Sequence, residues 1–302
     1  MNTNKKLYGI CPICSAIHKT NGDIDFEGTA NLIDFLVDKG VGGITLFGYG
    51  HEFYKFTEDE MEKILKFTVK HVEGRVPVAA SILQGSIDSF ISRAKLYESM
   101  GADALMIVPP YFMPVAEKDY FKLYIKIDEK ASIPIIVQDA PHLTGVSLSP
   151  TFFVNLFNKT KNINIAKLEC QAPGLKITEL KKLTNNKINI FNGSAGRYII
   201  DGLERGIEGV MPGCALAEVY VKIFNNFKKG NIDKAYEIFN KLIPLINFMH
   251  QSVEAVNKWE KVILKKRGVI KDDYCRFPAF HLDDIYLKQF EKLYELIEEF
   301  ID

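Results

Sequence analysis

Along residues 7–213, short apolar runs alternate with amphipathic stretches of helical spacing. The stretch over 57–71 begins with Thr57 and three acidic residues, the pattern of a helix N-cap and acidic first turn. Runs that are apolar on both faces are typical of strands in a parallel sheet covered by helices. We therefore predict eight strands, near residues 7–13, 42–48, 76–82, 103–109, 133–139, 163–169, 188–193 and 208–213.

Three segments of the chain, 35–48, 96–110 and 202–213, resemble one another. In each, an amphipathic helix ends at a glycine and a short apolar strand follows. Gly40, Gly101 and Gly206 stand where a left-handed residue ends a helix, so we expect positive φ angles at all three. The recurrence indicates one helix-then-strand unit used repeatedly.

Eight alternating β and α units predict an α/β fold, a (β/α)8 TIM barrel. A doubly wound sheet is the alternative, but no GxGxxG follows the first strand. After residue 216 the strands stop, and 218–250, 252–268 and 283–300 all have helical patterns. We predict a catalytic barrel over residues 1–220 and a C-terminal helical extension over 221–302.

The composition narrows the choice of partners and compartment. Lys+Arg and Asp+Glu number 38 each, which favours neither nucleic acid nor an anionic membrane and permits self-association. No apolar stretch is long enough to span a membrane, and the N-terminal stretch is not a convincing signal peptide. Five scattered cysteines indicate reduced thiols, so we expect a cytoplasmic protein and a homo-oligomer, dimer or tetramer.

Cys11 and Cys14 form a CxxC pair, which raises the question of a metal or redox site. A zinc site needs a second ligand pair and a redox motif opens a helix after a strand, and neither context follows here. We favour small buried residues at this position, with redox or metal chemistry as the alternative. We expect no metal and no cofactor.

In a (β/α)8 barrel, functional groups gather at the carboxyl ends of the strands. The sixth strand carries Lys167 and Glu169, two residues apart and therefore on one face. A structural ion pair is one interpretation of this pair. The other is a Schiff-base lysine, because burial favours the free amine, which attacks a ketone to form an iminium that a nearby carboxylate can help to deprotonate.

Loops at the same ends are candidates for holding a substrate carboxylate through backbone N–H groups. They contain Gly48, Gly50 and His51 after the second strand, and Gly193 and Ser194 after the seventh. A tight turn is the alternative for the two glycines after the second strand, and a solvent-facing loop histidine is the alternative for His51.

Several of these segments resemble the dihydrodipicolinate synthase / N-acetylneuraminate lyase superfamily of class I aldolases. The similar segments are GYGHEFYKFTEDE, GADALMIVPPYF, IPIIVQDAPHLTG, AKLEC, FNGSAGR and GVMPG, and the resemblance covers roughly residues 7–300. It implies a (β/α)8 barrel with a C-terminal helical region, frequent tetramers, and a Schiff-base lysine at Lys167.

The sequence departs from the family pattern at four places. The tyrosine of the fifth strand falls on Gln138, the hydroxyl pair after the second strand on Tyr49 and Gly50, and the second aromatic after the fourth strand on Phe112. The arginine with which synthases bind their aldehyde substrate falls on Leu143. Gln138 with Lys167-x-Glu169 resembles the subgroup of 2-keto-3-deoxy-pentonate dehydratases, in which the glutamate is implied to do the acid/base work.

These observations predict a Schiff-base lyase that acts on a small 2-oxo acid, by dehydration or retro-aldol cleavage of a 2-keto-3-deoxy sugar acid. We expect Lys167, Glu169 and Gln138 to be catalytic. Tyr111 and Met211 complete the predicted substrate-binding set with Gly48, Tyr49, Gly50, His51, Gly193 and Ser194. The alternatives are pyruvate condensation of the 4-hydroxy-tetrahydrodipicolinate synthase type, and a catalytically silent barrel that binds a keto acid.

Overall fold

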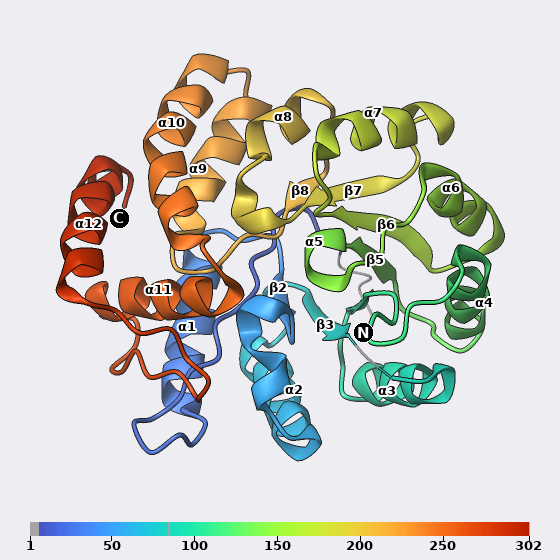
Figure 1. The fold of residues 1–302 in the computed structure, drawn as a ribbon, viewed down its shortest axis with the longest axis horizontal. Helices are drawn as coiled ribbons and strands as arrows, with labels where there is room; N and C mark the ends of the chain where they lie inside the picture. The colour runs from blue at the N-terminus through green and yellow to red at the C-terminus, as the bar shows by residue number, and fades with distance from the viewer. Residues whose placement is uncertain (1–5, 84, 302) are drawn as a thin grey trace.

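The computed structural model describes residues 6–83 and 85–301, and within them eight parallel strands form one sheet. Figure 1 shows these strands at the centre of a ring of helices. Their order, β1-β8-β7-β6-β5-β4-β3-β2, runs around the ring. The strands are β1 (Gly9–Ile10), β2 (Ile44–Leu46), β3 (Val78–Ile82), β4 (Ala104–Ile107), β5 (Ile135–Asp139), β6 (Ile163–Leu168), β7 (Asn189–Asn192) and β8 (Gly209–Val210).

The sheet closes on itself through the segment that follows β1. The amide of Gly42 donates to the carbonyl of Ile10 at 2.7 Å, and that of Thr45 donates to Pro12 at 3.0 Å. Cys14 returns a bond to the carbonyl of Thr45. These bonds join the first and second strand segments, so the fold is the predicted (β/α)8 barrel and the doubly wound alternative is wrong.

Helices follow the strands as the sequence pattern predicted. They are α1 (Phe26–Asp38), α2 (Glu58–Val72), α3 (Ile87–Ser99), α4 (Glu117–Asp128), α5 (Pro141–Thr144), α6 (Pro150–Lys159), α7 (Pro173–Leu183) and α8 (Ile199–Glu204). Thr57 and Glu60 form a capping box at the start of α2, as its sequence indicated. Gly40, Gly101 and Gly206 have φ angles of 75°, 93° and 79°, which confirms the expected left-handed helix ends.

Two apolar layers lie on the two faces of the strands. Side chains such as Met106, Ile136 and Ile165 fill the barrel interior, while alternate residues such as Val137 and Ala166 belong to the larger cluster that includes the helices. This separation follows from strand geometry, because successive side chains point to opposite faces. Polar residues on the interior face of a strand are therefore placed at the barrel axis.

The C-terminal helices gather on one side of the barrel, coloured orange to red in Figure 1. They are α9 (Ala217–Lys228), α10 (Ile232–Met249), α11 (Val253–Lys266) and α12 (Asp284–Tyr294), followed by the 3-10 helix η4 (Glu295–Phe300). The predicted division at residue 220 falls inside α9, which itself contacts β1. The predicted outer bounds, residues 1 and 302, lie outside the described residues, as do the first five residues of the N-terminal stretch.

Short 3-10 helices bring the loops and the C-terminal region together. After β2 come η1 (Tyr49–His51) and η2 (Phe53–Lys55), and η3 (Ser194–Gly196) follows β7. Helix α11 contacts η1 directly. Within the described part of the chain, none of the helices is both long and apolar enough to cross a membrane.

Candidate active site

Lys167 and Glu169 lie on the interior face at the end of β6. Lys167 Nζ is 3.5 Å from Glu169 Oε1, and both side chains are more than nine-tenths buried. In the strand register Lys167 pairs with Gln138 on β5 and with Phe191 on β7. Strand alternation thus places the two charges of β6 together beside the amide of β5.

Glu169 is held by two hydrogen-bond donors as well as by the ammonium group. Gln138 Nε2 donates to Oε2 at 2.5 Å, and the backbone N–H of Ser194 donates to Oε1 at 2.8 Å. Burial alone raises the pKa of Glu169, but Lys167, these two donors and His142 outweigh it and leave the pKa below its ordinary value. Glu169 is therefore a carboxylate at neutral pH, ready to accept a proton.

At Gly193 there is no room for a side chain, because Glu169 fills the space that a Cβ would occupy. A Cβ at this position would lie 2.0 Å from Glu169 Oε1 and 2.3 Å from its Cδ. The loop after β7 can approach the carboxylate, and donate the N–H of Ser194, only while residue 193 is glycine. The sequence predicted that the N–H of Ser194 would bind a substrate carboxylate, but in the structure it is engaged by Glu169.

A cavity of about 100 Å³ opens onto this group. Seven of the residues predicted from the sequence line it: Tyr49, Gly50, Gln138, Lys167, Glu169, Ser194 and Met211. Gly48 and Gly193 are the neighbours of lining residues along the chain. Tyr111 lines an adjacent surface depression with Phe112 and Met113.

Tyr49 brings a phenol to the cavity from η1. Burial raises the pKa of Tyr49, and the neighbouring Tyr111 and the charge of Glu169 raise it further. The phenol is consequently neutral and keeps its proton. A hydroxyl donor therefore stands near Glu169, although the family's hydroxyl pair is absent at positions 49 and 50.

The side chain of His51 is placed away from the cavity lining. Its Nδ1 donates to the carbonyl of Cys14 at 2.8 Å, and its backbone N–H donates to the carbonyl of Gly48 at 2.9 Å. Burial lowers the pKa of His51 to about 4, so the ring is neutral. The structure does not bring this histidine to the substrate space, and both its Nδ1–H and its backbone N–H are already used.

Sequence reasoning missed the side of the cavity built by α5 and the C-terminal helices. His142, His250, Val253, Val256, Asn257 and Glu260 all line it. Glu260 accepts a bond from the backbone N–H of Ala215 at 2.7 Å, and burial raises its pKa. A polar residue on the apolar face of a predicted helix is the only sequence signal that marks Asn257 and Glu260.

The cysteines near the first strand have the properties of packed side chains. Cys11 and Cys14 are buried, and burial raises the pKa of Cys11 to about 12 and that of Cys14 further above its ordinary value. Among the described residues no group of three His, Cys, Asp or Glu side chains is arranged to hold a metal ion.

A closed (β/α)8 barrel with a buried lysine–carboxylate pair at the carboxyl ends of its strands is an architecture suited to Schiff-base chemistry. The sequence model of the dihydrodipicolinate synthetase family matches residues 6–297. The chain belongs to the dihydrodipicolinate synthetase family, and it is a lyase of the aldolase and dehydratase type.

Individual relatives differ in the reaction that their names give. An L-2-keto-3-deoxyarabonate dehydratase of Azospirillum brasilense is 27% identical over 274 residues, covering 89% of this chain and 88% of that protein. A 4-hydroxy-tetrahydrodipicolinate synthase of Methanococcus vannielii is 28% identical over 243 residues, covering 80% and 83%. The crystal structure of dihydrodipicolinate synthase from Rhodopseudomonas palustris superimposes with a TM-score of 0.90 at 24% identity, covering 97% and 98% of the two chains, and supports the fold.

Proposed function

We propose that this lyase dehydrates or cleaves a 2-keto-3-deoxy sugar acid through an iminium on Lys167. The observation that carries the proposal is the contact of Lys167 with Glu169, whose carboxylate is held by Gln138 and Ser194. An amine beside a fixed carboxylate inside a barrel suits Schiff-base chemistry, in which one group binds carbon and the other moves a proton.

In the proposed reaction the amine of Lys167 adds to the 2-oxo carbon, and loss of water gives the iminium. Glu169 removes a proton from C3, and the electron pair of that C–H bond forms the enamine. For dehydration the enamine expels the C4 hydroxyl, which takes a proton and leaves as water. For retro-aldol cleavage C3 keeps its hydrogens: starting from the iminium, Glu169 instead takes the proton of the C4 hydroxyl, a C4 carbonyl forms, and the electron pair of the breaking C3–C4 bond forms the enamine.

Two positions favour a sugar acid over the condensation carried out by synthases. Gln138 cannot donate and accept a proton as the tyrosine of the synthases does, and here its amide is committed to Glu169. Leu143 lines the cavity where synthases have an arginine for their aldehyde substrate. The substrate carboxylate is expected at the turn that contains Gly48 and Gly50.

Borohydride trapping with pyruvate tests the proposal. Wild-type protein is expected to gain the mass of a reduced pyruvyl adduct on Lys167, and Lys167→Ala is expected to gain none. Lys182→Ala, an exposed lysine of α7, is the matched control and is expected to trap pyruvate normally. A wild-type protein that traps neither pyruvate nor any other small 2-oxo acid would overturn the proposal.

Product analysis then separates the reactions. A panel of 3-deoxy-2-oxo pentonates and hexonates, followed by product mass, distinguishes loss of water from release of pyruvate and an aldehyde. Condensation of pyruvate with aspartate semialdehyde would instead establish the synthase reaction. Adduct formation without turnover of any member of the panel would favour the silent keto-acid-binding barrel.

We also propose that the protein is a cytoplasmic homo-oligomer. All five cysteines are free thiols, which suits a reducing compartment.

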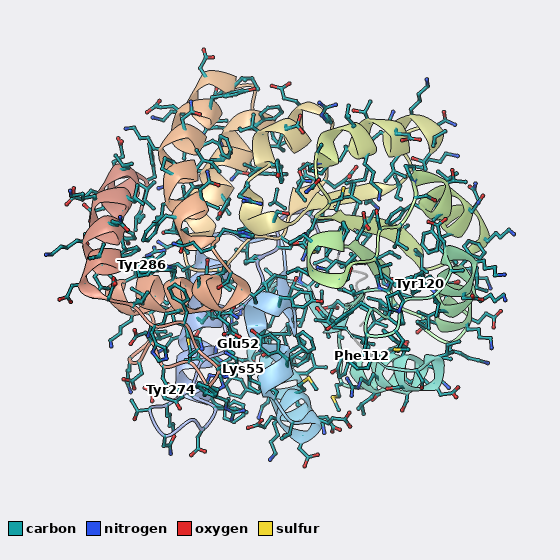
Figure 2. All side chains as sticks on the ribbon, viewed as in Figure 1. Glu52, Lys55, Phe112, Tyr120, Tyr274 and Tyr286 are labelled. Carbon is teal, nitrogen blue, oxygen red and sulfur yellow. The ribbon has the colours of Figure 1, made fainter. Side chains whose placement is uncertain are left out.

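The self-association rests on an exposed apolar segment between β4 and α4, where Figure 2 labels Phe112. Within it, Phe112, Met113 and Val115 are 89%, 73% and 51% exposed. Exposed apolar groups of this kind mark contact surfaces, and a second copy of the chain is the partner proposed here.

A further inference from the structure

Asn257 is a buried amide in the cavity wall that the proposed chemistry does not use. It lies on α11, is 1% exposed and lines the cavity. Its Nδ2 donates to the backbone carbonyl of Tyr49 and to the hydroxyl of Tyr54, both at 3.3 Å. Its Oδ1 has no hydrogen-bond partner among the described residues. A buried acceptor left in this state costs free energy unless a donor reaches it.

The amide of Asn257 is fixed in this orientation by the chemistry of its neighbours. A backbone carbonyl can only accept, and the hydroxyl of Tyr54 gives its proton to Glu254 Oε1 at 2.7 Å. Both atoms facing Nδ2 are therefore acceptors, and a flipped amide would set oxygen against oxygen. Oδ1 is consequently the unpartnered end of an amide whose residue lines the cavity.

A buried network of charges keeps Tyr54 and α11 in place. Lys55 Nζ lies 2.6 Å from Glu254 Oε2 and 2.7 Å from Glu52 Oε1. Glu52 Oε2 in turn contacts Lys261 Nζ at 2.5 Å, and the side chains of Glu52 and Lys261 are 0% and 1% exposed. Figure 2 labels Glu52 and Lys55 side by side. The network joins the segment of η1 and η2, which contains Tyr49, to the helix that carries Asn257.

We infer that Asn257 determines substrate specificity by accepting a hydrogen bond from a hydroxyl beyond the 2-oxo group. This inference rests on the proposed function and adds the residue that recognises the polyhydroxy end of the substrate. An amide oxygen selects a hydroxyl donor over a second carboxylate, which brings no proton at neutral pH. Tyr54 is a positioning residue that acts through Asn257.

The test compares a substrate that has the hydroxyl with one that lacks it. We expect Asn257→Leu to lower kcat/KM for a 3-deoxy-2-oxo pentonate by about tenfold or more. The rate of borohydride trapping with pyruvate, which has no hydroxyl, should fall by a much smaller factor. Asn240→Leu, an exposed asparagine of α10, is the matched control and should change neither quantity.

Equal losses in the two measurements would overturn the inference, because they would show a structural role. So would an Asn257→Leu variant with wild-type kcat/KM for the pentonate. If the wild-type protein traps pyruvate but processes no 3-deoxy-2-oxo acid, or traps no 2-oxo acid at all, the proposed function itself fails first and the inference falls with it.

Tyr54→Phe is a second, gentler variant, since 41% of this residue is exposed and only the hydroxyl is lost. It leaves Asn257 without one of its two fixed acceptors. We expect kcat/KM for the pentonate to fall through a higher KM, with pyruvate trapping and the thermal unfolding midpoint nearly unchanged. A fall in kcat alone, or no change at all, would contradict the positioning role.

Discussion

Gln138 on β5 donates its side-chain N–H to Glu169, the residue that follows β6, so this carboxylate is held from the neighbouring strand. The register sets Gln138 directly beside Lys167, two residues from the carboxylate that it binds. The position that carries a titratable hydroxyl in synthases here supports a carboxylate. In the proposed mechanism, Glu169 is therefore the one group that moves protons.

Glu169→Gln separates adduct formation from proton transfer. The variant keeps Lys167 and the shape of the site, so we expect pyruvate to be trapped by borohydride. Turnover of the sugar acid should fall by a factor of about 10² to 10⁴, the usual contribution of a general acid–base group. Glu179→Gln, on the exposed face of α7, changes the net charge equally and should have no effect. Wild-type turnover in Glu169→Gln would remove this residue from the mechanism.

If Glu169 moves the proton, we expect the acid limb of the kcat–pH profile to follow the ionisation of its carboxylate. Lys167, the N–H of Ser194 and Gln138 outweigh burial and lower its pKa, so the active ionised form persists below the ordinary glutamate value of 4.5. Activity should be lost only as the pH falls through this lowered value. Gln138→Leu removes one donor to the charged form, so its pKa rises and the acid limb of kcat moves to higher pH. An unmoved acid limb, with folding checked by circular dichroism at each pH, would contradict this role of Gln138.

Gly193→Ala tests the close approach of the loop after β7 to Glu169. The new Cβ would meet Glu169 Oε1 at 2.0 Å, so the carboxylate or the loop must move. A displacement of about 1 Å at a catalytic group can lower the rate about 100-fold, and we expect a loss of kcat of that order.

Gly40→Ala is the control for that variant. Its Cβ would meet nothing within 4 Å, but its φ of 75° strains any other residue. We expect it to lower the free energy of unfolding by about 1 kcal/mol and to leave kcat unchanged. Equal kcat losses in the two variants would show that Gly193→Ala acts through general destabilisation.

The barrel and the charged pair of β6 were predictable because both depend on local patterns. Runs that are apolar on both faces located all eight strands. The alternation of side chains along a strand predicted that Lys167 and Glu169 share one face, and the structure brings them into contact. The glycines that end three of the helices marked the repeated helix-then-strand unit of the barrel. These signals are encoded within a few residues of one another.

The rest of the site depends on contacts between segments far apart in the chain. Asn257 contacts the carbonyl of Tyr49, some 200 residues away, and no periodicity of α11 contains that information. The direction of the His51 ring depends on the conformation of η1 and on the carbonyl of Cys14. Loop conformation and helix placement therefore decided which polar groups reach the cavity.

Phe112→Glu tests the proposed self-association. Because Phe112 is 89% exposed in the chain alone, its replacement should not affect the folding of one subunit. We expect the dissociation constant of the oligomer to rise by about tenfold or more, measured by analytical ultracentrifugation over a range of concentrations. Leu175→Glu, an exposed leucine of α7, is the control. An unchanged mass distribution would place the contact surface elsewhere.

Lys261→Met tests the buried ion pair that joins the loop after β2 to α11. Burial raises the pKa of Glu52, but Lys261 and Lys55 outweigh it and lower the pKa, so the variant leaves a buried carboxylate with one partner fewer. We expect the free energy of unfolding to fall by about 3 kcal/mol in urea titrations. Lys265→Met, on the same helix with a side chain that is 49% exposed, breaks a surface pair and should cost at most about 0.5 kcal/mol.

The double variant Glu52→Gln/Lys261→Met separates the charge from the packing. In the double variant a neutral amide replaces the carboxylate of Glu52, so the loss of the ammonium group of Lys261 costs less free energy of unfolding. The double variant should therefore recover part of the stability lost in Lys261→Met. If Lys261→Met costs no more than Lys265→Met, or if the effects of the two substitutions simply add, the ion pair does not hold the loop against α11. Tyr49 and Asn257 would then owe their positions to apolar packing alone.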